Sequence, residues 1–426
     1  MNMRNAWLLH AWMAIPGFAV ASECPSCAYD HEYRALTLAH DDASKDIYVD
    51  DYAASAGDYF FDDRAIQVAM HVAKDGERVL LSPGETYTVC RPVYVYKAIV
   101  LATAPGGEKA TIRRCDAQEA LLTAPAFVGD KMVQVDDSSP FVRGMQVSPV
   151  RYFGGGPAAG EVDVTHVVLG ASDGLVEFSK PLHRNYAVGD SLITSFNMLE
   201  VTSPGASVVD VVMDGNRSGN GHFAAWQTHK SISVGWGADG VRIDGVEFVE
   251  SQADAINITG ASGVSIERSL FEGLNGSAVH VSNTANTTVR GSAMRRTNED
   301  AYRIGHAEGV VTWSHNNEAV SVEKNCAQGA PEAAFVRWNV STDNHGARIT
   351  DNRVCGTQGF LDVFASDTSA SATSGDMSHN IALDVGECRV DGVTGLVFVG
   401  NTLYGGSLVA PPGNTFVGNW GFGQQE

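Results

Sequence analysis

At 426 residues the chain is long enough for one large solenoid or two ordinary domains. Its formal net charge of −21 at pH 7 argues against nucleic acid as a partner, because binding a polyphosphate needs a basic surface. An acidic polysaccharide is not excluded, since a local cluster of arginines can override the net charge.

The first 21 residues have the pattern of a signal peptide. Arg4 supplies the positive start, residues 6–15 are mostly apolar, and Ala19-Val20-Ala21 is a small-x-small cleavage site. The apolar run is too short to span a bilayer. We therefore expect residues 1–21 to be removed and residues 22–426 to be secreted or periplasmic, with no membrane partner after cleavage.

The clearest helix is predicted over about residues 62–75, starting at Asp62-Asp63 and stopped by Gly76. Its apolar side chains share one face; they are Ile66, Ala69, Met70 and Ala73. A strand, a turn at Pro83-Gly84 and a second strand follow. An amphipathic helix in this place can cover the open end of a solenoid.

Residues about 139–200 interrupt the rhythm of the rest of the chain. Residues 164–169 and 174–178 are alternating strands that are longer than the others, and a glycine-rich stretch at 154–157 precedes them. We predict a small β excursion that leaves the solenoid and walls one end of its surface.

Three stretches of similar pattern recur about 23 residues apart, at 240–258, 263–281 and 286–304. Each holds short β-branched strands separated by Gly, Ser or Asn, with no helix between them. Such a period predicts one solenoid coil per repeat, and therefore an all-β parallel β-helix. Downstream, apolar strand ends are followed by Asn at 325, 352, 380, 401 and 419, which predicts a stacked ladder at successive bends.

The seven cysteines fit an oxidising compartment. Cys90 and Cys115 lie about one coil apart, as do Cys326 and Cys355, so each pair can join neighbouring coils. Cys24 and Cys27 predict a local disulfide at the mature N-terminus. Cys388 is then the one cysteine without a predicted disulfide partner.

The N-terminal segment resembles the cap of the pectate-lyase-like (pectin-lyase fold) right-handed β-helix superfamily. The resemblance is carried by residues 50–53, by the acidic helix start and by residues 80–87; Met213-Asp214-Gly215-Asn216-Arg217 resembles a loop of the same group. It implies one right-handed parallel β-helix domain over residues 22–426. The superfamily contains polygalacturonases, polysaccharide lyases, mannuronan epimerases and phage tailspikes, so a polysaccharide is the implied partner.

Superposing the repeats by their strand pattern places Asn257, His280 and Arg303 at one outward position on successive coils, with Asp362 continuing the column. A lyase or uronate epimerase would use His280 as base and Arg303 or Arg337 to neutralise the uronate carboxylate. Tyr302 and His306 are the candidate acids, and Trp313 on a loop could stack on a sugar.

A second column, formed by Asp254, Ser277 and Asp300, begins the same strands. Asp254 and Asp300 would lie two coils apart, roughly 9–10 Å, close to the carboxylate separation of an inverting glycosidase. Glycoside hydrolysis is therefore the first alternative. The Asn298-to-Asp300 and Gly305-His306 segments resemble polygalacturonase motifs, although they are crowded into nine residues.

A non-catalytic polysaccharide-binding adhesin or tailspike-like protein is the second alternative, and it needs only a polar face with aromatic platforms. The remaining histidines lack metal-ligand spacing, so no cofactor or metal is expected, with loosely placed Asp groups leaving Ca²⁺ open. Oligomeric state is open at this stage.

Overall fold

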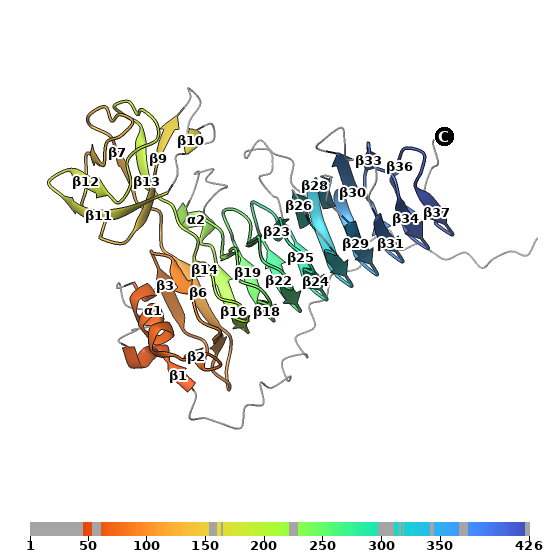
Figure 1. The fold of residues 1–426 in the computed structure, drawn as a ribbon, viewed down its shortest axis with the longest axis horizontal. Coiled ribbons are helices and arrows are strands. Elements are labelled where there is room, and N and C mark those ends of the chain that lie inside the picture. The colour runs from red at the N-terminus through yellow and green to blue at the C-terminus, as the bar shows by residue number, and fades with distance from the viewer. Residues whose placement is uncertain are drawn as a thin grey trace, which may run out of the picture.

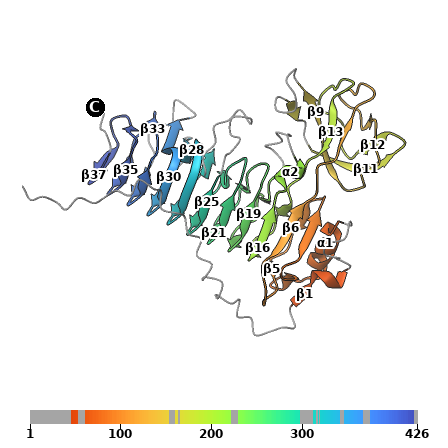
Figure 2. The ribbon, with the colours of Figure 1, turned by 180° about the vertical axis from the view of Figure 1, so that it is seen from behind.

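The computed structural model describes residues 46–52, 61–152, 160–162, 165–220, 229–296, 311–314, 317, 319–340, 345–365 and 374–421. The predicted signal peptide and the Cys24–Cys27 pair lie outside these residues. The described chain is a right-handed parallel β-helix, as the repeats and the resemblance indicated. Figures 1 and 2 show the coils stacked from the capped N-terminal end to β37.

Twelve strands pair in parallel along one side of the solenoid. They are β1 (Asp46–Tyr48), β2 (Arg78–Leu81), β5 (Val100–Thr103), β15 (Ser207–Val209), β18 (Arg242–Asp244), β21 (Ser265–Glu267), β24 (Thr288–Arg290), β27 (Ser321–Glu323), β29 (His345–Thr350), β31 (Ser374–Ser378), β34 (Leu396–Val399) and β37 (Thr415–Val417).

A second row of parallel strands continues each coil. It holds β3 (Thr86–Val89), β6 (Ala110–Arg114), β16 (Val211–Asp214), β19 (Glu247–Val249), β22 (Leu270–Glu272), β25 (Ala293–Arg295), the first parts of β28 (Cys326–Val340) and β30 (Arg353–Ala365), β32 (Ile381–Leu383) and β35 (Thr402–Tyr404).

A third row completes the coils. It contains β4 (Val93–Val95), β14 (Leu199–Val201), β17 (Ile232–Val234), β20 (Ile256–Thr259), β23 (Val279–Ser282), β26 (Val311–Ser314), the last parts of β28 and β30, β33 (Cys388–Asp391) and β36 (Leu408–Val409). Two short helical turns, η3 (Val49–Tyr52) and α2 (Arg217–Asn220), complete the elements outside the excursion and the cap. One apolar core runs through the coils because alternate residues of every row point inward.

The asparagine ladder is confirmed. The side-chain amide of Asn352 donates to Val322 O at 2.8 Å and to Asn380 Oδ1 at 2.9 Å, and it accepts from the Asn325 backbone at 3.0 Å. The same pattern continues to Asn401 and Asn419. The left-handed residue at each bend is the one before the asparagine, such as Asp351 with φ of 57°, so the asparagine acts through its amide and not through its backbone.

Helix α1 (Asp63–Val72) covers the first coil. The predicted apolar face is buried against the core, with Ile66 and Ala69 fully inaccessible. Asp62 and Asp63 accept backbone amides of Thr88 and Cys90, which fixes the helix on β3.

Ile66→Asp tests the capping role. A carboxylate at this position would be buried against apolar side chains with no partner. We expect the free energy of unfolding to fall by about 3–5 kcal/mol, measured by denaturant titration. Val72→Asp, at an exposed site on the same helix, is the control and should change it little. Equal stability of the two variants would contradict a cap.

The β excursion is a separate seven-stranded antiparallel sheet inserted between β6 and β14. It was expected over about residues 139–200, but its strands begin earlier and end at Thr194; they are β7 (Glu119–Leu121), β8 (Met132–Gln134), β9 (Gln146–Tyr152), β10 (Gly160–Val162), β11 (His166–Ser172), β12 (Leu175–Phe178) and β13 (Ser191–Thr194). It has a small core of its own.

The Cys90–Cys115 disulfide ties the start of this insertion to the first coil, and Cys326 and Cys355 are also disulfide-bonded. Cys388 is free and buried, and burial raises the pKa of its thiol.

Candidate functional site

In the third row of strands one outward-facing position carries a polar side chain from β4 to β33, and in β36 the same position holds Val409. Strand register aligns nine side chains, here called the polar row: Tyr94, Glu200, Ser233, Asn257, His280, Thr312, Arg337, Asp362 and Arg389. Neighbouring strands are about 4.8 Å apart, so consecutive members are neighbours in space. Asn257 and His280 are adjacent as expected, and Arg337 and Asp362 continue the same line.

The expected place of Arg303 in this line is wrong. β23 pairs with β26, and the residue opposite His280 is Thr312. Val311 and Trp313 alternate with Thr312 and are buried, which is the apolar-polar-apolar pattern that a core strand requires. Arg303, Asp300, Tyr302 and His306 lie outside the described residues. Of the two arginines predicted to neutralise the uronate carboxylate, the structure therefore describes Arg337 alone.

His280 is held by Asp254. The Nδ1 atom of His280 lies 3.3 Å from Oδ2 of Asp254, while the Ser277 amide donates to Oδ1 at 3.0 Å. Asp254 is nearly inaccessible, whereas about a fifth of the His280 side chain is exposed. The imidazole therefore lies at the surface on a buried, oriented carboxylate.

Burial alone would raise the pKa of the Asp254 carboxyl, but its partners outweigh burial. The hydrogen bond and charge of His280, the charge of Lys230 and the Ser277 amide together hold the pKa below its ordinary value. An ionised Asp254 accepts a proton donor, which places the imidazole proton on Nδ1. The basic nitrogen of that tautomer is Nε2.

Two coils away, Glu200 behaves in the opposite way. Burial raises the pKa of its carboxyl, although hydrogen bonds from Asn197 and Ser233 and the charge of Lys230 oppose the shift. The Asn197 amide donates to Oε1 at 2.8 Å. Lys230 thus influences both carboxyls, and their environments move the two pKa values apart, which is a common feature of acid–base sites.

The raised pKa of Glu200 has a consequence for stability. Because the folded protein holds this proton more tightly than the unfolded chain, stability should fall as pH rises from the ordinary value of 4.5 through the folded pKa. We expect Glu200→Gln to raise Tm by about 2–4 °C at pH 7 and to have little effect below pH 4. Thermal melts across this range test it. Glu177→Gln, at an exposed carboxyl, is the control, and an equal gain at both pH values for Glu200→Gln would contradict the assignment.

An exposed tryptophan lies beside the polar row. Trp236 follows β17 and is 71% exposed, and its ring covers Gly260, the corresponding residue after β20. A Cβ on Gly260 would lie 2.1 Å from the indole ring, so only glycine allows this placement. Trp236 is three residues beyond Ser233, about 10 Å along the strand. An exposed indole with one face against the backbone is suited to stack on a sugar ring.

The aromatic platform that the sequence predicted at Trp313 is wrong. Trp313 is not on a loop; it is buried in the coil interior, edge to face with Trp338 at a centroid distance of 5.3 Å. At the C-terminal part of the row, Arg337 lies 3.6 Å from Asp362 and its guanidinium is 4.8 Å from the Phe364 ring. Both charges are partly exposed, so this pair adds little stability.

Among the described residues no group of three or more His, Cys, Asp or Glu side chains could hold a metal ion. No helix in the described part of the chain is long and apolar enough to cross a membrane.

Glu200, Lys230 and Trp236 were missed by sequence reasoning. Leu199-Glu200-Val201 and Ile232-Ser233-Val234 share the apolar-x-apolar pattern of the later repeats, and this signal could have extended the row toward the N-terminus. The insertion between β6 and β14 hides the period from the sequence.

The similarities of this chain to known proteins are distant. No family model and no curated protein matches the sequence. The solved structures it is similar to include an exopolygalacturonase from Thermotoga maritima, with 10% identity over 85% of this chain and 80% of that one and a TM-score of 0.49. Others are the polygalacturonase of Erwinia carotovora, with 11% identity over 85% and 93% and a TM-score of 0.48, and the Dettilon tailspike protein, with 9% over 88% and 68% and a TM-score of 0.49.

Proposed function

We propose that the protein is an exported carbohydrate-active enzyme that removes the C5 proton of a uronate in an acidic polysaccharide, as a lyase or an epimerase. The observation that carries the proposal is the Asp254–His280 pair on the outer face of the polar row. A buried carboxylate that fixes an exposed imidazole is the arrangement of an oriented general base.

In this mechanism Nε2 of His280 takes the C5 proton. Asp254 is the positioning residue, because it holds the ring and stabilises the imidazolium that forms. Asn257 and Thr312 flank the imidazole and can bind sugar hydroxyls. Arg337 is two coils, about 10 Å, from His280, where it can bind the carboxylate of a neighbouring sugar. Arg303 is kept as a proposed group for neutralising the reacting carboxylate, with Tyr302 or His306 as acid.

Glycoside hydrolysis is the second candidate, and the opposite pKa shifts of Glu200 and Asp254 favour it. Their strands are two coils, about 10 Å, apart, and Asp254 lies three residues before Asn257, the row position aligned with Glu200, so their Cα atoms are farther apart than the 6.5–9.5 Å between the carboxyls of inverting enzymes. Glu200 would be the acid and Asp254 the base. In this alternative Glu200 replaces Asp300 as the second carboxyl of the pair predicted from the sequence.

A screen of the purified protein against acidic and neutral polysaccharides tests the proposal. Ultraviolet absorbance of an unsaturated product identifies a lyase, and exchange of the C5 proton in D₂O identifies an epimerase. New reducing ends without either signal favour hydrolysis. Binding without any of the three would favour an adhesin and contradict catalysis.

Trp236 should contribute to substrate binding. We expect Trp236→Ala to raise KM about 10-fold with a smaller effect on kcat, since stacking contributes about 1–2 kcal/mol. Gly260→Ala should do the same because it displaces the ring. Gly240→Ala is the matched control: its φ of 68° is close to the 71° of Gly260, but a Cβ there meets nothing within 4 Å. Equal KM values for Gly260→Ala and Gly240→Ala would exclude Trp236 as a sugar platform.

A further inference from the structure

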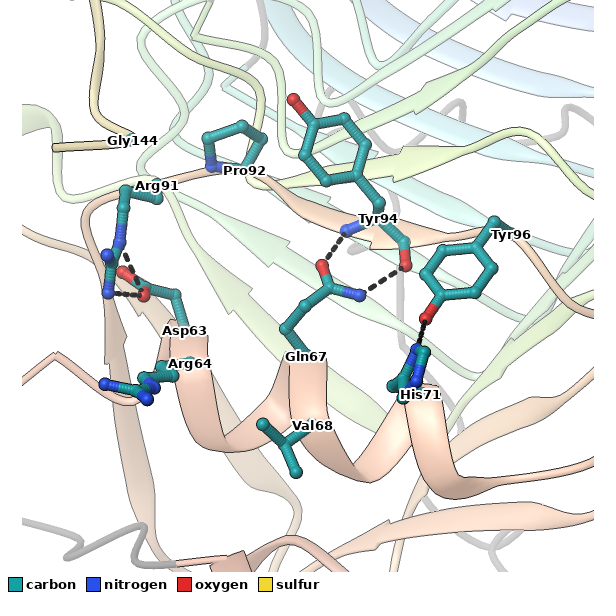
Figure 3. A pocket seen from close by; sticks show the side chains of 10 residues that line it. All are labelled: Asp63, Arg64, Gln67, Val68, His71, Arg91, Pro92, Tyr94, Tyr96 and Gly144. Carbon is teal, nitrogen blue, oxygen red and sulfur yellow. Dashed lines mark hydrogen bonds and ion pairs between the residues drawn. The ribbon is translucent and has the colours of Figure 1, made fainter. Parts of the chain in front are cut away.

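A pocket of about 650 Å³ lies at the N-terminal end of the polar row. Helix α1 contributes Arg64, Gln67 and His71, the β4 segment contributes Arg91, Tyr94 and Tyr96, and Gly144 comes from the excursion. Figure 3 shows the helix along one side and the segment from Arg91 to Tyr96 along the other. Tyr94 is also the first member of the polar row, so the pocket and the row are continuous.

The walls of this pocket are held in place before any ligand binds. Gln67 bonds the backbone of Tyr94 in both directions, at 2.8 and 3.1 Å, and His71 Nδ1 bonds the Tyr96 hydroxyl at 2.7 Å. Arg91 donates through both Nε and Nη2 to one oxygen of Asp63, Oδ1. Both tyrosines nevertheless remain 41% exposed. A rigid pair of aromatic rings with polar edges suits a sugar better than a flexible peptide.

The charge around the pocket is opposite to that of the whole chain. Asp63 is neutralised by Arg91, which leaves the exposed Arg64 guanidinium in excess. Lys97 adds a further positive charge, 5.7 Å from the centre of the Tyr96 ring, while the Glu200 carboxyl, next to Tyr94 in the polar row, lies on the opposite side. In a chain with a net charge of −21, a locally positive aromatic pocket selects an anion.

We propose that this pocket is a distal subsite for an acidic sugar residue of the polymer that the polar row binds. From Tyr94 to His280 is four strand steps, about 19 Å, so a polymer held in the pocket reaches the Asp254–His280 pair only when it is several sugars long. Arg64 lies at the start of α1, whereas Tyr96 lies near its end, bonded to His71, so the carboxylate of one bound sugar pairs with Arg64 and the ring of a neighbouring sugar stacks on Tyr96. The identity of the polymer rests on the proposed function, whereas binding in the pocket does not require turnover.

Calorimetric titration of the full chain tests the subsite. The probes are oligosaccharides of galacturonic, mannuronic and guluronic acid, short and long, and the carboxyl-reduced form of the best binder. We expect Arg64→Gln and Tyr96→Ala each to raise Kd of the long acidic probe about tenfold. Tyr96→Phe keeps the ring and should bind nearly as well as the wild type.

Arg348→Gln is the matched control, because it makes the same charge change at an exposed position on β29, outside the pocket. It should leave Kd unchanged. Equal weakening by Arg64→Gln and Arg348→Gln, equal binding of the carboxyl-reduced probe, or no binding of any acidic probe would each overturn the subsite. All titrations are repeated with His280→Ala, so that turnover does not disturb the measured Kd. Failure of the proposed function would show as absent turnover by the wild type, whereas failure of the subsite would show as equal Kd values for Arg64→Gln and Arg348→Gln.

Discussion

Replacing His280 with alanine should lower kcat/KM on the polysaccharide found by the screen by about 10²–10⁴-fold, the usual contribution of a general base. The expected loss is mainly in kcat, because the imidazole exchanges a proton in the transition state, whereas sugar binding depends on the rest of the row. Initial rates with wild type and variant measure it.

The pH profile separates a base from a merely structural histidine. Histidine is the side chain that ordinarily titrates between pH 5 and 8, so the variant should lose the limb of the rate profile in that range. His345→Ala, at an exposed histidine of the first row of strands, is the control and should keep both rate and profile. A His280→Ala enzyme within a few-fold of the wild type would exclude the base role.

Features with a local cause were predictable from the sequence. The ladder was predicted because an amide at each bend bonds both its own coil and the next one. The cap was predicted because Ile66 and Ala69 lie on one helical face. Asn257 and His280 were aligned correctly because their two coils have the same length.

Features that depend on loop length were not predictable. Val279 and Val311 are 32 positions apart in the numbering, against 23 for Ile256 and Val279, and the next coil therefore presents Thr312 in place of Arg303. Loops vary freely in length at low thermodynamic cost, so a fixed period fails there while the strands still pair.

The candidate site also depends on contacts between segments that the sequence separates. Glu200 joins the row only because the excursion returns the chain to β4. Asp254 and His280 are 26 residues apart and meet because one coil stacks on the next. The Asp254 strand start was interpreted from sequence as half of a carboxylate pair, whereas the structure places its carboxylate against the His280 imidazole.

Asp254→Asn should lower kcat by about 10²–10⁴-fold while leaving the coil folded. An amide can donate to Nδ1, which favours the tautomer with its proton on Nε2 and removes the base. Thermal melts check the fold. Because the pKa of Asp254 is depressed, its contribution to stability is complete above the unfolded pKa and is lost as pH falls through the folded value. Wild type and variant should therefore converge in stability in acid and differ near neutrality.

Glu200→Gln decides between the two proposed reactions when it is compared with Asp254→Asn. Glu200 lies three strand steps, about 14 Å, from His280, which is too far for both to act on one sugar carbon. Proton abstraction by His280 therefore predicts a loss of less than about tenfold for Glu200→Gln, as for a binding residue. A hydrolase would lose about 10²–10⁴-fold, since Glu200 would be its acid, and His280→Ala would then be the milder change. Comparable, large losses for Glu200→Gln and Asp254→Asn with a weak effect of His280→Ala would replace the lyase or epimerase mechanism with hydrolysis.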